Sequence, residues 1–373
     1  MKIGILTLPL HTNYGGILQA WALQTVLERM GHEVKVINYP LVRKPSYAKS
    51  LVLYIYRNIK NRIFGDRKCC TKWYAGRLAT FYIRENTDKF IIKYIHNRFV
   101  SKLNEITENE FDVFVVGSDQ VWRKGYSQWR DICDSFLKFA QNWHVRRIAY
   151  AASFGKNNID EYTECEKKVC ADLLKLFEHV SVREHSGVDL CKDVFGVDTI
   201  QLIDPTLLLS KEDYNCLIDA IDLPKVEGAL FKYVIDECPV INEAIDVIKA
   251  NYNWKTFCVN GLLGDNNANI LDRIQKPVEQ WLQAFRDADA VITDSFHACV
   301  FSIIYNKPFL VFGNESRGLS RFETILRLTN LEDRLVTSKE EAIQKKHLLT
   351  IAPNVYSKLG EYKKKSFDFL KKI

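Results

Sequence analysis

Residues 2–40 read KIGILTLPLHTNYGGILQAWALQTVLERMGHEVKVINYP. The opening residues form a short apolar run, and residues 17–30 carry apolar side chains at helical spacing, with Gly31 in the position of a helix C-cap. Residues 32–40 then predict a second strand. Strand, helix and strand in this order predict two parallel strands joined by a right-handed crossover.

The same pattern continues along the chain. Apolar runs that end in small or polar residues occur at 111–122, 146–155, 179–187 and 198–206, and again at 229–237, 254–261, 288–295 and 307–314. Helical segments fit between the later runs, around 240–250, 278–287 and 295–305. We therefore expect an α/β protein with two doubly wound Rossmann-like domains, residues 1–206 and 207–345, that face each other across a cleft as in GT-B folds. Residues 346–373 predict a closing basic helix.

Composition agrees with a globular protein of two domains. The chain has 373 residues, which is longer than a single hydrophobic core usually organises. Of these residues 47% are hydrophobic and 26% are charged, a composition typical of globular proteins. No stretch approaches the length of a bilayer span, and the first residues do not resemble a signal peptide. Ten cysteines without a C-x-x-C pair favour reduced thiols. The expected location is the cytoplasm, with peripheral contact to the inner membrane face as an option.

Positive charge is concentrated in one segment. Residues 41–103 contain fifteen Lys and Arg against three Asp and Glu, a balance of +12, whereas the whole chain carries +6 and the remainder therefore −6. One interpretation is a solvated helical face. The other is a surface for an anionic partner, such as lipid headgroups or a lipid-linked pyrophosphate. Nucleic acid is disfavoured, because the chain contains no known nucleic-acid-binding motif.

The loops after the predicted strands would line the cleft. In open parallel sheets, ligands bind at the carboxyl ends of the strands. Those ends carry the polar stretches 13–16, 117–119, 153–155, 183–184 and 204–206. Gly15-Gly16 is not a G-x-G-x-x-G fingerprint, so a nicotinamide dehydrogenase is disfavoured. Asp287-Ala-Asp289 has a metal-motif spacing, but it lies away from the cleft side, and no metal is expected.

A single histidine follows the strand at 288–293. Ser295 is a good helix N-cap, which puts Phe296 and His297 in the first turn. A helix N-terminus offers free N–H groups and a partial positive charge, so it attracts anions. His297 is therefore either a site residue beside a bound anion or a core histidine with a structural hydrogen bond.

Six stretches together resemble the polysaccharide pyruvyl transferase family. They are NYGGILQAWALQTVLERMGHEV, FDVFVVGSDQVW, YAASFG, SVREHSG, LIDPTLLL and ITDSFHACVFSIIYNKPF, in the family's order. The resemblance implies a GT-B-like fold, phosphoenolpyruvate as donor, and a pair of sugar hydroxyls in a cell-surface polysaccharide as acceptor. The family histidine falls on His297 and a family arginine on Arg183, and Arg321 resembles a further basic position. Ser295 stands where other branches of the family have arginine.

This resemblance assigns roles to particular residues. Arg183 and Arg321, with the helix start at Ser295 and Phe296, would bind the anions of the donor. His297 would act as general acid or base. Glu184 and Asp119 would position or deprotonate the acceptor, or serve as structural hydrogen-bond partners. The acceptor would contact the loop residues Asn13, Tyr14, Gly15, Gly16, Ser118 and Gln120.

Phosphoenolpyruvate is a co-substrate in this scheme, and no cofactor is needed. The partners would be phosphoenolpyruvate and a lipid-linked or polymeric saccharide. Two other classes of function stay open: a glycosyltransferase with a nucleotide-sugar donor, and a non-catalytic scaffold of polysaccharide assembly. The identity of the acceptor sugar, the stereochemistry of the ketal and the oligomeric state do not follow from the sequence.

Overall fold

The computed structural model describes residues 1–39, 51–52, 55–56, 59, 75–127, 131–224, 228–263, 268–269, 271–314 and 318–373. Within them, the first domain contains a seven-stranded sheet in the order β3-β2-β1-β4-β5-β6-β7, in which neighbouring strands run parallel. Its strands are β1 (Lys2–Leu6), β2 (Glu33–Asn38), β3 (Asn97–Phe99), β4 (Val113–Val116), β5 (Arg146–Ala152), β6 (His179–Val182) and β7 (Ile200–Gln201). The chain adds β2 and β3 outward on one side of β1 and its later strands on the other side, so the strand order reverses between β1 and β4, as in a doubly wound fold.

Alternation along the strands sends side chains to two separate cores. Ile3, Ile5 and Val36 belong to one hydrophobic cluster, while Leu6 and Ile37 belong to another on the opposite face. Helix α1 (Tyr14–Arg29) covers the first face, and α4 (Glu164–Leu174) and α5 (His185–Asp193) cover the second. The predicted α1 begins at Tyr14 instead of residue 17, because Asn13 caps the helix by accepting a hydrogen bond from the Gly16 amide.

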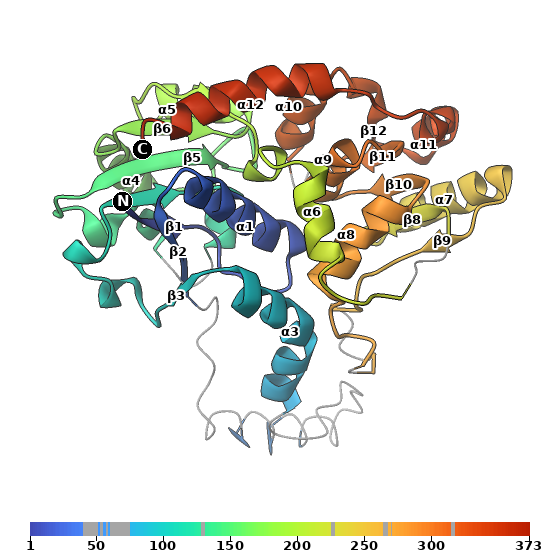
Figure 1. The fold of residues 1–373 in the computed structure, drawn as a ribbon, viewed down its shortest axis with the longest axis horizontal. Coiled ribbons are helices and arrows are strands. Elements are labelled where there is room, and N and C mark those ends of the chain that lie inside the picture. The colour runs from blue at the N-terminus through green and yellow to red at the C-terminus, as the bar shows by residue number, and fades with distance from the viewer. Residues whose placement is uncertain are drawn as a thin grey trace.

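The second domain repeats this architecture with five parallel strands (Figure 1). The order is β12-β11-β10-β8-β9, and the strands are β8 (Leu230–Tyr233), β9 (Thr256–Phe257), β10 (Ala290–Thr293), β11 (Phe309–Phe312) and β12 (Leu335–Val336). The helices are α7 (Pro239–Tyr252), α8 (Val278–Asp287), α9 (Phe296–Ile304), α10 (Ser320–Thr329) and α11 (Lys339–Gln344), and α6 (Lys211–Ile218) connects the two domains. The expected α/β fold with two Rossmann-like domains is confirmed.

One hydrophobic cluster joins the two domains. It contains Ile3 and Leu23 of the first domain together with Phe231 and Val291 of the second. Tyr14 lies at the centre of the contact: its ring stacks on Trp281 with centroids 5.3 Å apart, and its hydroxyl donates to the Lys276 carbonyl at 2.9 Å. The interface between the domains is therefore apolar and continuous with both cores.

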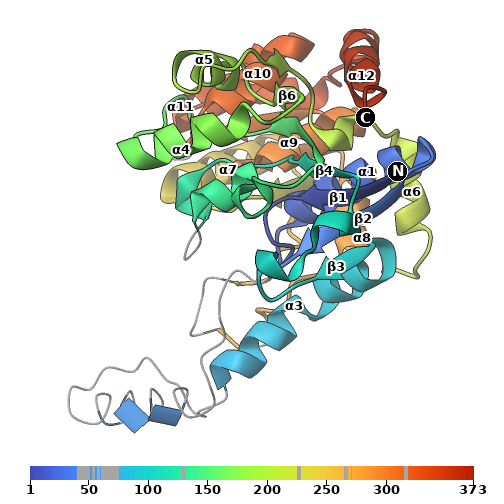
Figure 2. The ribbon, with the colours of Figure 1, turned by 90° about the vertical axis from the view of Figure 1, so that its left-hand side faces the viewer.

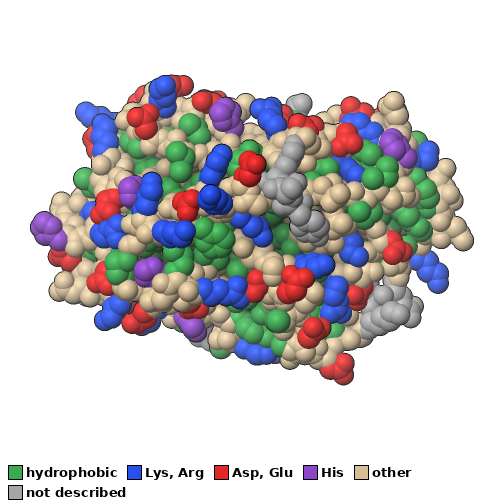
Figure 3. Space-filling view, turned by 45° about the horizontal axis from the view of Figure 1, so that its top comes forward, with side chains coloured by type: hydrophobic (Ala, Val, Ile, Leu, Met, Phe, Trp, Pro, Cys, Tyr) green, Lys and Arg blue, Asp and Glu red, His purple; other side chains and the backbone are tan. Residues whose placement is uncertain are grey.

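The C-terminal helix α12 (Tyr356–Leu370) crosses from the second domain back to the first (Figure 1). Phe369 packs on Tyr150 of β5 and on His179 of β6, with ring centroids 6.1 and 6.0 Å apart. The Arg146 guanidinium donates to the carbonyls of Lys372 and Ile373. On the face of the molecule that includes this end, basic and acidic side chains are intermixed (Figure 3).

The described part of the basic segment 41–103 is partly built into the first domain. Helix α3 (Ala75–Tyr94) extends away from the sheet at its N-terminal end (Figure 2), whereas Phe90 and Ile91 near its other end are buried in the shared core. Strand β3 then forms the edge of the sheet beside β2. All the basic residues at 41–74, including Arg57, Lys60 and Arg62, lie outside the described residues, so the predicted membrane surface stays a prediction. None of the described helices is long and apolar enough to span a bilayer.

Four of the eight described cysteines are buried, namely Cys133, Cys170, Cys191 and Cys299, and none of the eight is in a disulfide. Burial raises the pKa of the Cys133 thiol to about 11. Cys258, in contrast to these four, is exposed. The reason is its place at the end of the short edge strand β9, where the chain leaves the sheet.

Candidate functional site

A pocket of about 260 Å³ lies between the domains. Its walls come from the loop after β1, the loop after β4, the loop after β8 and the start of α9. These are the points at which the strand order reverses in each sheet, between β1 and β4 and between β8 and β10. Such points are where open α/β sheets bind ligands. The pocket, called here the interdomain pocket, is lined by Leu8, Pro9, His11, Asn13, Asp119, Gln120, Tyr126, Ile235, Asp294, Ser295, Phe296, His297 and Arg321.

Arg321 is a buried cation in the pocket wall, and no carboxylate of the described residues pairs with it. No described residue forms an ion pair or a hydrogen bond with its guanidinium, and its Nε is enclosed without any acceptor. Burial and the nearby Arg183 lower the pKa of Arg321 to about 10, so it stays charged at neutral pH. A buried charge without a counter-ion is costly, which makes this end of the pocket attractive to an anion.

Phe296 lies close to both buried arginines, Arg183 and Arg321. The Arg183 guanidinium carbon lies 4.3 Å from the centroid of the Phe296 ring, and that of Arg321 lies 5.7 Å from it. Cations are attracted to the face of an aromatic ring. Phe296 therefore contacts both guanidinium groups in the wall of the pocket.

His297 occupies the first turn of α9, as predicted. Ser295 is the N-cap, and its hydroxyl accepts a hydrogen bond from the Ala298 amide at 3.5 Å. The imidazole is almost completely buried, and its Nε2 lies 3.5 Å from an oxygen of Asp204. The ring also lies directly against Gly15, since a Cβ atom on Gly15 would overlap with it. The absence of a side chain at Gly15, in the first turn of α1, therefore leaves the space that the His297 imidazole occupies.

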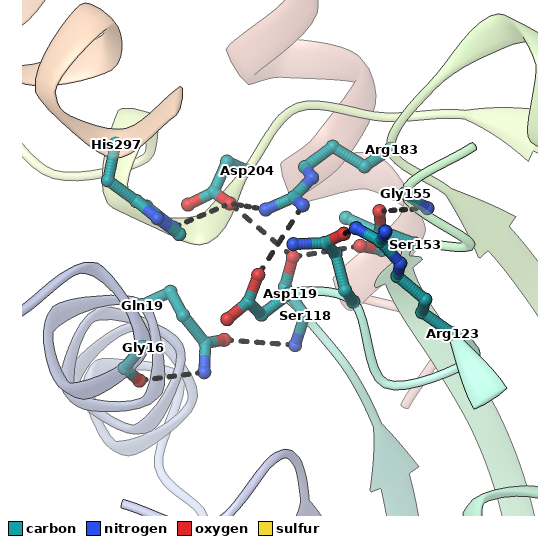
Figure 4. Close-up of polar contacts among 12 residues, drawn as sticks. Gly16, Gln19, Ser118, Asp119, Arg123, Ser153, Gly155, Arg183, Asp204 and His297 are labelled. Carbon is teal, nitrogen blue, oxygen red and sulfur yellow. Dashed lines mark hydrogen bonds and ion pairs between the residues drawn. The ribbon is translucent and has the colours of Figure 1, made fainter. Parts of the chain in front are cut away.

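Asp204 connects the histidine to a buried charge network (Figure 4). One carboxylate oxygen accepts from Arg183 at 2.7 Å, and the other accepts from the amide and hydroxyl of Thr206. Burial alone would raise the pKa of Asp204, but His297, Arg183 and the Thr206 amide hold it well below its usual range. Asp204 is thus a buried carboxylate that lies beside His297, a contact that we did not predict from the sequence.

Arg183 lies behind the pocket and is not one of its lining residues. Besides Asp204, it has Asp119 at 3.5 Å and Glu184 at 4.0 Å. Burial opposes the charge, but Asp204, Asp119 and Glu184 raise the pKa of Arg183 above its ordinary value. Its guanidinium is therefore engaged with carboxylates of the protein, which differs from the donor-binding role predicted for it.

Glu184 is also buried behind the pocket. Its Oε1 accepts hydrogen bonds from the Ser153 hydroxyl and from the amides of Phe154 and Gly155, at 2.7 to 3.0 Å. These bonds fix the loop after β5. The structural alternative fits Glu184, because it does not line the pocket from which an acceptor would be deprotonated.

Asp119 lines the pocket from the loop after β4. Its backbone has a φ of +62°, a conformation that is uncommon outside glycine. The backbone carbonyl accepts from the amides of Val121 and Ser153, which stabilises this turn. Strained residues of this kind often occur at functional sites, and here the turn directs the carboxylate toward Arg183 (Figure 4).

The predicted acceptor residues divide into two groups. Asn13 and Gln120 line the pocket. Tyr14, Gly15 and Ser118 do not: Tyr14 belongs to the core between the domains, Gly15 supports the histidine ring, and Ser118 donates from its amide to Gln19 and from its hydroxyl to Ala151. Gly16 provides the backbone carbonyl that Gln19 binds, at 2.9 Å (Figure 4).

Several pocket residues were not expected from the sequence. His11 follows β1 and Tyr126 follows β4. Neither segment has the apolar periodicity of a strand or a helix, so no pattern placed these residues at the pocket. Asp294 accepts hydrogen bonds from the amides of Ile235 and Asp236 and thereby fixes the loop after β8. Its position directly after a buried strand was the only available signal. Among the described residues, no group of His, Cys, Asp and Glu side chains could hold a metal ion.

The two domains touch near the pocket through glycine backbones. A Cβ atom on Gly318, whose φ is +87°, would overlap with the carbonyl oxygen of Gly155. Gly155 has a φ of +74°, and a side chain there would overlap with Gln120. Both positions therefore require glycine, and they bring the loop before α10 close to the loop after β5.

Solved structures define the class of the fold. The chain resembles the UDP-GlcNAc 2-epimerase of Neisseria meningitidis bound to UDP-GlcNAc, with a TM-score of 0.53, 11% identity and full coverage of both chains. It also resembles Arabidopsis thaliana UGT89C1 complexed with UDP-L-rhamnose, with a TM-score of 0.50, 8% identity and coverage of 100% of this chain and 97% of that one. With its site between two Rossmann-like domains, the protein has a GT-B-like fold.

A family model identifies the particular group. The model of polysaccharide pyruvyl transferase matches residues 13–316, which include α1, the loop after β4, the Asp204 turn and α9. The chain belongs to the polysaccharide pyruvyl transferase family, and the resemblance noted in the sequence is confirmed. No curated protein matches it.

Proposed function

We propose that the protein transfers the pyruvyl group of phosphoenolpyruvate to two hydroxyls of a sugar in a cell-surface polysaccharide or its lipid-linked precursor. Membership of the pyruvyl transferase family supports a transferase of this general class. The observation that carries the choice of donor is Arg321, a buried cation in the wall of the interdomain pocket that forms no ion pair with any described residue.

The pocket suits a small donor with two anionic groups. Phosphoenolpyruvate carries a phosphate and a carboxylate. Arg321 can bind one of them through its fork of N–H donors, and the free amides at the start of α9 can bind the other. Ser295 is small and already caps the helix, so in this branch Arg321 supplies the charge that other members place two residues before the histidine.

The reaction needs a proton at the methylene carbon of the donor. Protonation there leaves an oxocarbenium-like centre at the neighbouring carbon, to which the first sugar hydroxyl adds as it loses its proton. Phosphate then leaves with the electrons of its C–O bond, and the second hydroxyl adds and loses its proton. Of the two protons released by the sugar hydroxyls, one replaces the proton that was given to the methylene carbon, and the other leaves with phosphate. The products are a ketal and inorganic phosphate.

His297 is suited to handle the first proton. The neighbouring Asp204 carboxylate can stabilise the imidazolium that forms when the ring takes up a proton. The other ring nitrogen, Nδ1, makes no hydrogen bond to a described residue. His297 is therefore the proposed proton donor, and Arg183 acts through Asp204 as a positioning residue.

The test is a mass-spectrometric assay with phosphoenolpyruvate and an array of p-nitrophenyl hexosides. The expected product has the mass of the hexoside plus pyruvic acid less one water. Arg321→Ala should weaken the binding of phosphoenolpyruvate by at least about tenfold, the effect of losing a charged hydrogen bond. Arg327→Ala, on the exposed face of the same helix, is the matched control and should bind the donor normally.

Calorimetry separates this proposal from its main alternative. The structural relatives named above are bound to UDP-sugars, so a nucleotide-sugar donor is the competing hypothesis. Binding of UDP-GlcNAc or UDP-glucose without any binding of phosphoenolpyruvate would contradict the proposal. Binding of neither donor class would favour the non-catalytic scaffold instead.

A further inference from the structure

A second cavity adjoins the interdomain pocket on the side of the first domain. Its volume is about 280 Å³, and it opens at the carboxyl ends of β1, β2 and β3. Pro9 and His11 line both cavities. A ligand in this second cavity, called here the side cavity, could therefore extend past these two residues into the interdomain pocket.

One wall of the side cavity is an exposed aromatic ring. Phe99 is the last residue of β3, and 60% of its surface is exposed. The C–H face of a pyranose ring packs well on such a surface, while its hydroxyls need hydrogen-bonding groups around the edge. An aromatic ring beside convergent polar groups is a common composition for a site that binds a small polar ligand.

The polar groups around Phe99 are held in place by the protein. The Arg84 guanidinium donates to Asp88 from Nε and Nη2, at 3.1 and 2.7 Å, and to the Leu10 carbonyl at 3.1 Å. The Glu105 carboxylate accepts from the Ser101 amide at 3.1 Å. Because these side chains are oriented before any ligand arrives, a saccharide would lose little free energy in ordering them.

We propose that the side cavity binds a sugar ring of the acceptor, with Phe99 as the stacking surface, and that His11 orients the attacking hydroxyl where the two cavities meet. The proposal rests on the proposed function, because it assumes that the donor occupies the interdomain pocket. It replaces part of the acceptor surface predicted from the sequence, since Tyr14 and Ser118 do not line either cavity.

The environment of His11 suits this role. Its Nδ1 lies 3.0 Å from the Thr12 hydroxyl, which fixes the ring. Burial, helped by Arg84 and opposed by Asp119, lowers the pKa of His11 to about 4. The imidazole is therefore neutral at physiological pH, and a neutral imidazole can accept a hydrogen bond from a hydroxyl.

Saccharide binding can be measured without the donor. The probes are the p-nitrophenyl hexosides used in the transfer assay, and the readout is saturation-transfer NMR on the wild type, Phe99→Ala and Phe99→Trp. We expect Phe99→Ala to weaken binding by about tenfold, as the loss of a stacking contact commonly does, and Phe99→Trp to retain it. Ile92→Ala removes another exposed apolar side chain, on α3 and outside the cavity, and should have no effect.

Kinetics supply a second readout where transfer occurs. Phe99→Ala should raise KM for the hexoside and leave KM for phosphoenolpyruvate unchanged. Equal hexoside binding by the wild type and Phe99→Ala would overturn the side-cavity proposal, and so would a wild type that binds none of the hexosides at millimolar concentration. Binding that depends on Phe99 in a protein that transfers no pyruvyl group would support the saccharide site and contradict the proposed function.

Discussion

At the scale of single residues, the position of His297 depends on the absence of a side chain at Gly15. We expect Gly15→Ala to displace the imidazole and reduce transfer about as much as His297→Ala, by roughly 100-fold or more. The matched control is Gly16→Ala, whose added Cβ would make only ordinary contacts, the nearest at 3.4 Å with Asn13. The measurement is the transfer rate, with thermal unfolding to verify the fold. Full activity in Gly15→Ala would show that the ring need not lie against α1.

His11 should make stability depend on pH. In the unfolded chain its pKa is near 6.5, and in the folded protein it is about 4. As pH falls below 6.5, the unfolded state takes up a proton that the folded state does not, so stability is lost until both states are protonated below pH 4. Between pH 7.5 and 5, the wild type should lose about 1 to 2 kcal/mol more than His11→Asn. Urea unfolding at the two pH values measures this, and identical losses would argue against a neutral His11 in the folded protein.

At the scale of elements, α12 attaches the end of the chain to the first domain through Phe369. Replacing this buried ring with alanine leaves a cavity against Tyr150 and His179, and we expect a loss of about 3 kcal/mol in the free energy of unfolding. Phe367→Ala, on the same helix but only half-buried, should cost distinctly less. Equal losses in urea unfolding would mean that the packing on β5 and β6 contributes little.

Elements were also the level at which the sequence was most informative. Continuous apolar runs predicted strands β4 and β10, and the segments between such runs predicted helices α7, α8 and α9 close to their observed bounds, because a strand buried on both faces leaves an uninterrupted apolar trace. The N-cap at Ser295 was predicted for the same local reason. Contacts such as that between Tyr14 and Lys276 join residues 262 positions apart, and no local pattern encodes them.

The candidate site was predictable only in part for this reason. His297, Asp119 and Arg321 line the pocket as expected, since each follows a strand or begins a helix at the cleft. Arg183 and Glu184 also follow a strand, but they form hydrogen bonds with buried groups behind the pocket. Whether a polar residue at a strand end faces the ligand or the protein depends on partners from other loops.

At the scale of the whole molecule, the shared hydrophobic cluster should make the two domains unfold together. Domains with small polar interfaces often melt separately, but here the apolar core runs from the first sheet into the second. We expect a single calorimetric transition whose calorimetric and van't Hoff enthalpies agree. Tyr14→Ala, which removes a ring from the centre of this core, should lower the melting temperature of the whole molecule. Two resolved transitions in the wild type would contradict a shared core.

The pocket's location at the strand-order reversals of both sheets has a consequence for evolution. Arg321 and the start of α9 come from one domain, whereas His11 and Asn13 come from the other. Substitutions in the first domain can therefore alter which partner molecule is accepted while the half proposed to bind the anion stays intact. A chimera that takes its first domain from one family member and its second domain from another could therefore combine the ligand specificities of its two parents. It would still fold only if the Tyr14 ring of one parent fitted the Trp281 surface of the other, so divergence of the two halves is constrained at that contact.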